Sequence, residues 1–364
     1  MNEQALSILN DDGSCPEEYL DLVSDEDLAR ILRLMIFNRA LDRRTTMLQR
    51  QGRIGFAMTS FGEEAVTIGA PACLEPTDPI FLQYRELGAL LWRGVDLRLI
   101  LNQLFGNSGD TSKGRQMPVH YCFADWHIPS VSSPVGTQLP HACGYAYAAK
   151  FRGTGQVALA FLGEGTASQG DFHTALNFSG VFRVPAVFVI RNNGYAISTP
   201  ETRQTAASSL AARAVGYGIP GVRIDGNDLL AVVHVVKRAV EWAREGNGPT
   251  LIEALTYRLG AHSSADDPSV YRSEDETRSW LEVDALRRLK LHALWRGVWK
   301  EDIEEELRKQ ADEEIQRTLS ESEKLPPPPV ESLFDDVYET LPWHLQEAKQ
   351  DYLQFLRKRN AERV

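Results

Sequence analysis

Two short, uninterrupted apolar runs constrain the fold most strongly. They are VALAFL at residues 157–162 and PAVFVI at residues 185–190. A strand that is buried on both faces of a sheet is apolar throughout, which is typical of parallel strands covered by helices. Residues 168–182, between the two runs, are compatible with a helix, so the three segments form a strand–helix–strand unit. The runs therefore predict an α/β protein.

Further segments extend this unit. Residues 228–246 have the pattern of an amphipathic helix, and residues 250–258 that of another strand. We therefore predict an α/β fold whose mostly parallel sheet is covered by helices on both faces, with an N-terminal helical arm and a C-terminal helical extension. The expected parts are an arm and helix, an α/β domain and a helical region, at residues 1–50, 51–273 and 274–364. Residues 105–140 lack periodicity and predict a long, functional loop.

The composition limits the class of partner and the location. Of 364 residues, 43% are hydrophobic and 24% are charged, and the formal net charge is −11. Nucleic acids are bound by cationic surfaces, so this charge argues against them. No apolar run reaches the length of a membrane span. Residues 1–28 are acidic, unlike a mitochondrial targeting segment, so we expect a cytoplasmic protein.

The ends of the two apolar runs carry groups that point to a bound ligand. Gly163, Glu164 and Gly165 follow the first run, and Asn192 and Asn193 follow the second. Because parallel strands end at one edge of the sheet, these groups should meet where α/β proteins bind ligands. Carboxylate and amide oxygens suit Mg²⁺, which proteins commonly share with phosphates. The two glycines let a diphosphate approach the backbone near the start of the following helix.

Other phosphate-binding motifs do not fit this region. A dinucleotide fingerprint requires a third glycine where this chain has Ser168, and no stretch has the pattern G-x-x-x-x-G-K-[ST]. The remaining alternative is an ordinary strand-to-helix turn beside a loop that contains two asparagines. The strands, the spacing and the double asparagine together favour a site for a diphosphate and magnesium.

The segment GEGTASQGDFHTALNF…RNNGYAISTP resembles the thiamine diphosphate motif in the alpha subunits of 2-oxo acid dehydrogenase decarboxylase components. The resemblance continues through FLQYREL, SKGRQMPVHY, SSPVGTQLPHACGYAYAAK, GYGIPGVRIDGND and YRLGAHSSADDPSVYRSEDE, over about residues 25–345. It implies the thiamine-diphosphate-binding fold. The motif usually begins Gly-Asp-Gly, but Glu164 replaces the aspartate, as is common in branched-chain members. QYRE and GRQMPVHY also favour the branched-chain type.

The resemblance also implies the residues that bind the cofactor. It matches Glu164, Asn193 and the carbonyl of Tyr195 to ligands of magnesium. The other matched cofactor-binding positions are Tyr84, Arg85, Ser133, Val135, Gly163, Gly165, Thr166, Arg191 and His262. Two arginines beside one diphosphate also make electrostatic sense. A turn in branched-chain relatives that binds potassium is matched by Ser132, Pro134, Thr137 and Gln138.

His262 matches the active-site histidine of the family. Its implied role is proton transfer and stabilisation near the reacting thiazolium, followed by acyl transfer to a lipoyl group. Many relatives have His-His where this chain has Ala261 and His262, so any role of the first histidine is in doubt here. Ser263 and Ser273 occupy positions that are phosphorylated in mitochondrial relatives, and a phosphate on Ser263 would place negative charge beside His262.

The resemblance implies an enzyme subunit, since thiamine supplies the carbanion chemistry and the protein orients it. The expected reaction is oxidative decarboxylation of 3-methyl-2-oxobutanoate and transfer of the 2-methylpropanoyl group to the lipoyl arm of a dihydrolipoyl acyltransferase. In this family a beta subunit carries the glutamate that activates the cofactor, so we expect an α2β2 heterotetramer. The alternatives are a pyruvate or acetoin dehydrogenase subunit and a non-catalytic scaffold. The presence of Glu164, Asn193 and His262 argues against the scaffold.

Overall fold

A five-stranded sheet lies at the centre of the computed structural model, which describes residues 5–300 and 302–361. The strand order is β1-β2-β3-β7-β6, and every pairing in this sheet is parallel. The strands are β1 Ile80–Phe81, β2 Ala158–Gly163, β3 Ala186–Asn192, β6 Gly221–Asp225 and β7 Thr250–Leu255. The prediction of an α/β fold with a mostly parallel sheet is therefore confirmed.

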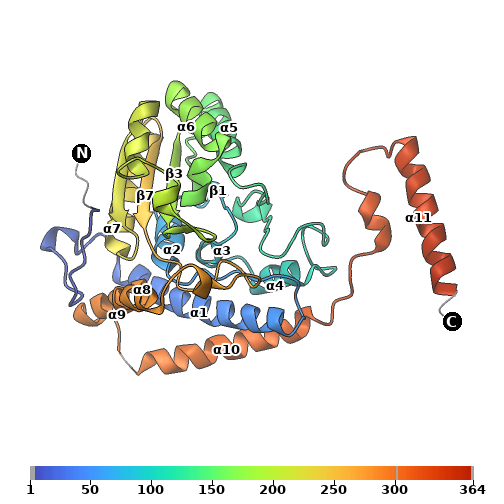
Figure 1. The fold of residues 1–364 in the computed structure, drawn as a ribbon, viewed down its shortest axis with the longest axis horizontal. Coiled ribbons are helices and arrows are strands. Elements are labelled where there is room, and N and C mark those ends of the chain that lie inside the picture. Colours follow the sequence, from blue (N-terminus) through green and yellow to red (C-terminus); the bar gives the residue numbers. More distant parts are fainter. Residues whose placement is uncertain (1–4, 301, 362–364) are drawn as a thin grey trace.

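Alternate residues of the central strands enter two cores on opposite faces of the sheet. In β2, Leu159 and Phe161 enter one core, and Ala160 and Leu162 enter the other. All four side chains are fully buried, which explains why the run contains no polar residue. Helices cover both faces (Figure 1). One core includes side chains of α2 Glu64–Ala72, α3 Leu87–Arg93 and α7 Leu229–Arg244, and the other includes those of α5 Gln138–Arg152 and α6 Gly170–Phe182.

Below the sheet, α1 packs against α9 and α10 (Figure 1). Helix α1 begins after Ser24, whose hydroxyl accepts a hydrogen bond from the backbone N–H of Asp27. Ile315 and Leu319 of α10 enter the same core as Leu159 of β2. The division of the chain near residues 50 and 273 stays a prediction. The helices here are α1 Asp25–Arg50, α4 Leu97–Phe105, α8 Glu274–Glu282, α9 Ala285–Trp295 and α10 Ile303–Ser322.

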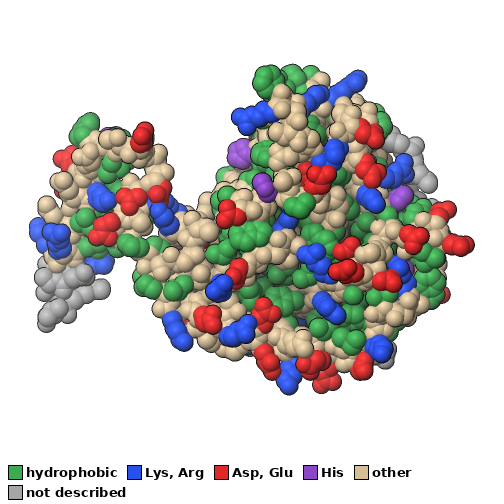
Figure 2. Space-filling model, turned by 180° about the vertical axis from the view of Figure 1, so that it is seen from behind, with side chains coloured by type: hydrophobic (Ala, Val, Ile, Leu, Met, Phe, Trp, Pro, Cys, Tyr) green, Lys and Arg blue, Asp and Glu red, His purple; other side chains and the backbone are tan. Residues whose placement is uncertain are grey.

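The proline-rich residues 326–329 lead away from the body of the molecule. They are followed by the 3-10 helix η7, Val330–Phe334, and by α11, Trp343–Ala361. Figures 1 and 2 show this segment as a lobe at the side of the molecule. Asp336 accepts hydrogen bonds from Lys113 and Arg115 and so ties the lobe to the loop before α5. Within residues 5–300 and 302–361, no helix is both long and apolar enough to span a membrane.

Short elements complete the chain. They are η1 Glu17–Tyr19, η2 Ala124–Trp126, η3 Glu164–Ser168, β4 Tyr195–Ala196, β5 Thr199–Pro200, η4 Glu201–Arg203, η5 Ala211–Tyr217 and η6 Pro268–Val270. Between α4 and α5 the only regular element is η2, so the predicted long loop is confirmed. The edge strands β1 and β6 were not predicted: β1 has two residues, and β6 has the alternating pattern of a half-buried strand, unlike the continuous apolar runs of β2 and β3.

Candidate active site

A cleft of about 450 Å³ opens at the carboxyl ends of β2 and β3. Helix α6 connects these two strands along the chain. Because the strands are neighbours in the sheet, Glu164 lies close to Asn193. The cleft is lined by every predicted cofactor-binding residue and by Tyr195. These are Tyr84, Arg85, Ser133, Val135, Gly163, Glu164, Gly165, Thr166, Arg191, Asn193, Tyr195 and His262.

The turn after β2 is fixed by close packing and by one glutamine that sequence reasoning missed. Gln83 Oε1 accepts hydrogen bonds from Gly163 N at 2.6 Å and from Thr166 Oγ1 at 3.2 Å. At Gly165 a Cβ atom would lie 2.7 Å from the Cβ of Ala196, so a larger residue would push the β4–β5 hairpin away. The turn thereby directs Glu164 into the cleft.

The three residues predicted to bind magnesium, Glu164, Asn193 and Tyr195, all line the cleft. Glu164 is 3% exposed, and its Oε2 accepts from Asn193 N at 3.4 Å. Burial raises the pKa of Glu164, and the nearby Glu63 carboxylate raises it further. A cation would reverse this effect, because it favours the charged carboxylate. The Tyr195 carbonyl accepts from Arg258 Nη1 at 3.0 Å and keeps a second lone pair.

The donor set suits magnesium better than a metal bound by side chains alone. Across the described part of the chain, no three His, Cys, Asp or Glu side chains are grouped so that they could hold a metal. One carboxylate, one amide and one carbonyl leave coordination positions for phosphate oxygens and water, as Mg²⁺ sites commonly do.

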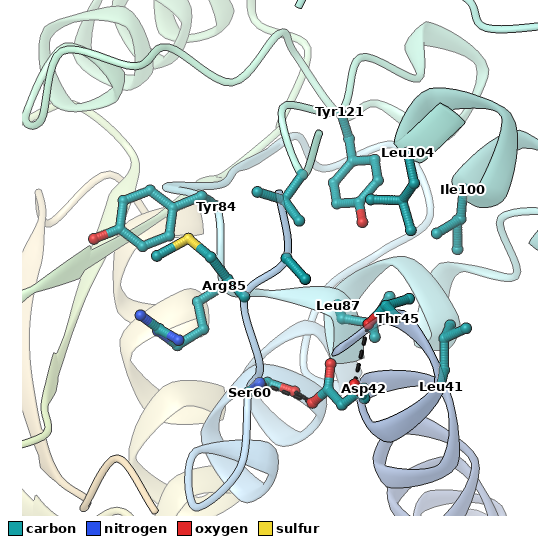
Figure 3. A pocket seen from close by; sticks show the side chains of 13 residues that line it. Leu41, Asp42, Thr45, Ser60, Tyr84, Arg85, Leu87, Ile100, Leu104 and Tyr121 are labelled. Atoms are coloured by element: carbon teal, nitrogen blue, oxygen red, sulfur yellow. Dashed lines mark hydrogen bonds between the residues drawn. The ribbon is translucent and has the colours of Figure 1, made fainter. Parts of the chain in front are cut away.

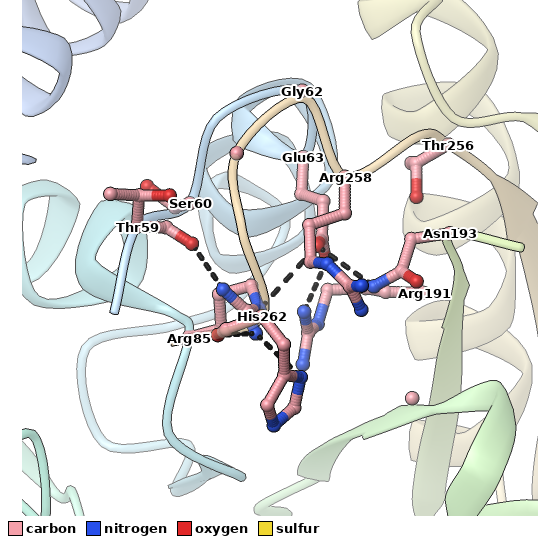
Figure 4. Close-up of polar contacts among 12 residues, drawn as sticks. Thr59, Ser60, Gly62, Glu63, Arg85, Arg191, Asn193, Thr256, Arg258 and His262 are labelled. Atoms are coloured by element: carbon pink, nitrogen blue, oxygen red, sulfur yellow. Dashed lines mark hydrogen bonds and ion pairs between the residues drawn. The ribbon is translucent and has the colours of Figure 1, made fainter. Parts of the chain in front are cut away.

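Two arginines and two carboxylates form a buried cluster beside these groups, and Figure 4 shows one of the carboxylates, Glu63, with both arginines. Arg191 pairs with Glu63 and with Glu86, and Arg85 Nε lies 3.6 Å from Glu63 Oε1. Burial lowers the pKa of Arg191, but Glu86 and Glu63 outweigh it and raise the pKa above its ordinary value. Burial lowers the pKa of Arg85 and Glu63 opposes that effect, and a guanidinium stays charged near pH 7. Arg191 Nε is buried and has no hydrogen-bond partner among the described residues, which leaves a donor for an anion.

His262 is held at the rim of the cleft by groups on both sides. Arg85 Nη2 donates to the His262 carbonyl at 2.9 Å and lies 3.5 Å from its Nδ1. Asp266 Oδ2 accepts from His262 N at 2.6 Å and from the Tyr271 hydroxyl at 2.6 Å. Burial, and then the charges of Arg85 and Arg258, lower the pKa of His262 to about 4. The imidazole is therefore neutral near pH 7 and can accept a proton.

This shift predicts a pH-dependent stability term that belongs to His262. The pKa falls from 6.5 to about 4 on folding, so the folded chain binds fewer protons between these values. Stability should therefore decrease as pH falls from 6.5 to 4 and level off below it, by up to about 2 kcal/mol for this partly exposed group. His262→Gln should lose this slope in urea denaturation between pH 4 and 7. His141→Gln, at an exposed position, should keep it; parallel curves for all three proteins would contradict the shift.

A smaller cavity of about 20 Å³, room for one water, lies behind Tyr84 and Arg85 (Figure 3). Asp42 borders it and accepts from Ser60 N and Ser60 Oγ, each at 2.8 Å. Burial raises the pKa of Asp42 to about 7. The carbonyl of Thr59, next to Ser60, accepts from Arg85 Nη1. Asp42 therefore anchors the segment that holds Arg85, a role that its sequence context on α1 did not indicate.

The predicted potassium-binding residues lie together in the turn that leads into α5. Thr137 Oγ1 donates to the Pro134 carbonyl at 3.0 Å, and Gln138 Oε1 accepts from Gly136 N at 3.2 Å. The Pro134 carbonyl, the Thr137 hydroxyl and the side-chain oxygen of Gln138 thus already make hydrogen bonds within the turn. Ser132 precedes Ser133, whose hydroxyl lies 2.7 Å from His120 Nε2.

The two serines at phosphorylated positions of relatives differ in their surroundings. Ser263 is half-buried beside His262, and its Oγ accepts from Ala265 N at 3.3 Å. Ser273 is exposed and caps α8, since its Oγ accepts from Glu276 N at 3.1 Å. Only Ser263 would bring a phosphate directly to the rim of the cleft.

Comparison with known proteins gives a consistent family. The dehydrogenase E1 component family matches residues 32–331. The mitochondrial 2-oxoisovalerate dehydrogenase subunit alpha of Homo sapiens is 43% identical over 332 residues, covering 91% of this chain and 75% of the relative. The Caenorhabditis elegans subunit is 45% identical over 305 residues, covering 83% and 70%. Subunit alpha 1 of Arabidopsis thaliana is 39% identical over 353 residues, covering 96% and 75%.

The predicted cytoplasmic location was wrong, because these relatives are mitochondrial subunits and point to mitochondria. The prediction rested on the acidity of residues 1–28. Part of that acidity has a structural cause, since Asp25, Glu26 and Asp27 form the first turn of α1, where carboxylates stabilise a helix. The match to residues 32–331, together with 39% to 45% identity to these relatives, shows that the chain belongs to the dehydrogenase E1 component family.

Proposed function

We propose that this chain is the alpha subunit of a thiamine-diphosphate-dependent dehydrogenase that acts on 3-methyl-2-oxobutanoate (2-oxoisovalerate). One observation carries the proposal: Glu164, Asn193, Arg85, Arg191 and His262 line a single cleft at the carboxyl edge of the sheet. The names of the relatives supply the substrate. The subunit would decarboxylate the 2-oxo acid and pass the acyl group to the lipoyl arm of an acyltransferase.

The residues of the cleft fit the cofactor and its metal. Thiamine diphosphate, when bound, supplies the carbanion chemistry of decarboxylation. Glu164 Oε, Asn193 Oδ1 and the Tyr195 carbonyl would hold Mg²⁺, and Arg85 and Arg191 would pair with the diphosphate. The orphaned Nε of Arg191 supports this assignment, because a buried donor without a partner is costly.

The remaining groups would shape the cleft and move protons. Tyr84, Ser133, Gly163, Gly165 and Thr166 line it, and the 37% exposed Val135 offers an apolar surface to the thiamine. His262 is neutral near pH 7, so it can accept a proton from the reacting group and return it during acyl transfer. A potassium ion would stiffen the turn of Ser132, Pro134, Thr137 and Gln138.

The site is completed by a second chain in this proposal. Among the described residues that line the cleft, Glu164 is the sole carboxylate, and it is assigned to the metal, so none is left to activate the aminopyrimidine of the cofactor. A beta subunit would supply that carboxylate, in an α2β2 heterotetramer that works with a dihydrolipoyl acyltransferase.

The substrate assignment predicts a clear preference. The chain is co-expressed with a beta subunit and supplied with thiamine diphosphate and Mg²⁺, and carbon dioxide release is measured with 3-methyl-2-oxobutanoate, pyruvate and acetoin. We expect kcat/KM for the branched-chain acid to exceed that for pyruvate by at least about tenfold, since one or two methyl groups in an apolar pocket change binding by that amount. A preference for pyruvate or acetoin would overturn the substrate. A folded heterotetramer without turnover on any of them would overturn the enzymatic function.

A further inference from the structure

Glu63 occupies an unusual position for a fully buried carboxylate. It precedes α2 at the N-cap, yet its side chain makes no capping hydrogen bond. The side chain instead points into the site, where Oε2 accepts from Arg191 Nη1 and Oε1 accepts from Asn193 Nδ2 at 3.0 Å (Figure 4). Glu63 is 0% exposed, so both interactions take place without water. A helix cap therefore does not explain why a carboxylate is buried here.

The bond to Glu63 determines which way the amide of Asn193 faces. Asn193 Nδ2 donates to the carboxylate, and Asn193 Oδ1 accepts from Tyr195 N at 3.3 Å. A flipped amide would place its oxygen against the Glu63 carboxylate and its NH2 group against a backbone N–H, and both contacts are repulsive. Glu63 thus turns the oxygen of Asn193, the atom that a cation needs, away from itself.

The same carboxylate also offsets the positive charge of Arg85 and Arg191, the two residues proposed to pair with the diphosphate. Glu63 contacts Arg191 directly, and its Oε1 lies 3.6 Å from Arg85 Nε. Together with Glu86, which also pairs with Arg191, Glu63 matches the charges of Arg85 and Arg191 one for one. An anion that enters without a cation therefore meets guanidinium groups whose charge is already offset, and in a buried site the neighbouring carboxylates repel it with little screening.

We propose that Glu63 makes diphosphate binding depend on a divalent cation, by orienting Asn193 toward the metal and by offsetting the charge of Arg85 and Arg191. The inference rests on the proposed function of the cleft. Glu63 would be a positioning residue for the metal, and its charge would couple metal binding to diphosphate binding. Such coupling is reciprocal, so the diphosphate must favour the metal as much as the metal favours the diphosphate.

The test measures both ligands on the heterotetramer of Glu63→Gln. Inorganic pyrophosphate is titrated by calorimetry in EDTA and in Mg²⁺, and Mn²⁺ binding with pyrophosphate present is followed by electron paramagnetic resonance. We expect metal-free pyrophosphate to bind about tenfold more tightly and Mn²⁺ about tenfold more weakly than in the wild type. The opposite signs are decisive, because local collapse of the site would weaken both ligands.

Two further variants separate charge from geometry. Glu63→Asp keeps the charge but withdraws it from Asn193, so Mn²⁺ should bind more weakly while metal-free pyrophosphate is unchanged. Glu64→Gln is the matched control, since Glu64, the next residue, is equally buried but pairs with Arg39, and no ion pair or hydrogen bond joins it to Asn193 or to the two arginines of the cleft. It should leave the ratio of pyrophosphate affinities with and without Mg²⁺ unchanged.

The outcomes distinguish this inference from the proposed function. If wild type binds pyrophosphate only with Mg²⁺ and Glu63→Gln keeps that dependence, the role of Glu63 is refuted and the cofactor site stands. If Glu63→Gln weakens both ligands, Glu63 is structural only. If the wild type binds pyrophosphate under neither condition, the proposed function of the cleft fails, and the inference fails with it.

Discussion

Arg191→Met is expected to destabilise the chain by about 3–5 kcal/mol and to abolish diphosphate binding. The guanidinium of Arg191 is buried between Glu63 and Glu86, and its removal leaves both carboxylates in the interior without their strongest partner. Methionine fills most of the volume, so the loss reports charge rather than a cavity. The free energy of unfolding in urea and the affinity for pyrophosphate measure the two effects.

An exposed arginine provides the control for Arg191→Met. Arg98 pairs with Asp96, but the side chains are 63% and 40% exposed. Arg98→Met should therefore cost no more than about 1 kcal/mol and leave pyrophosphate binding unchanged. An equal decrease in the free energy of unfolding of the two variants would mean that the buried cluster stabilises the fold no more than a surface ion pair does.

Glu164→Ala is expected to remove magnesium-dependent cofactor binding, with affinity for thiamine diphosphate falling by more than about 100-fold. Glu164 is the carboxylate among the three groups assigned to the metal, so without it only neutral oxygens remain. The free energy of unfolding should not decrease as well. Burial and the Glu63 carboxylate raise the pKa of Glu164, so its charge is unfavourable before a cation binds.

Calorimetry in Mg²⁺ and in EDTA checks the effect of Glu164→Ala. Glu305→Ala removes the same charge from the exposed first turn of α10 and should bind the cofactor as the wild type does. Unchanged affinity of Glu164→Ala in Mg²⁺ would refute its role as a metal ligand. A large fall in melting temperature together with the loss of binding would instead point to a structural role.

The centre of the fold was predictable because its strands are buried on both faces. The runs at residues 157–162 and 185–190 gave β2 and β3 to within two residues at each end, and the rule that parallel strands share an edge brought Glu164 to Asn193. Arg85 and His262 required the family resemblance, since no periodicity links residues so far apart in the chain. Tertiary packing brings the two residues together, and Arg85 donates a hydrogen bond to the His262 carbonyl.

The groups that support the site were harder to predict. Asp42, Glu63 and Glu86 lie in helical or loop sequences where a carboxylate usually faces water. Each has a partner from another segment: Asp42 meets the loop before α2, and Glu63 and Glu86 meet the end of β3, although Glu86 also accepts from the nearby Gln83 N and Tyr84 N. Gln83 likewise acts on the turn after β2 from the other side of the cleft. Such roles depend on the three-dimensional arrangement of the segments.

Because distant segments form the cleft, ligand binding should increase the fraction of subunits that stay folded. Gln83, Glu164, Asn193 and His262 meet only after the sheet is complete, so the unfolded chain has nothing that resembles the cleft. A ligand that binds the native state alone adds RT ln(1 + [L]/Kd) to stability, about 2.7 kcal/mol when its concentration is 100 times Kd. Cofactor supply would therefore set the proportion of subunits that stay folded as well as their activity, so that a shortage of thiamine diphosphate would lower the abundance of the protein.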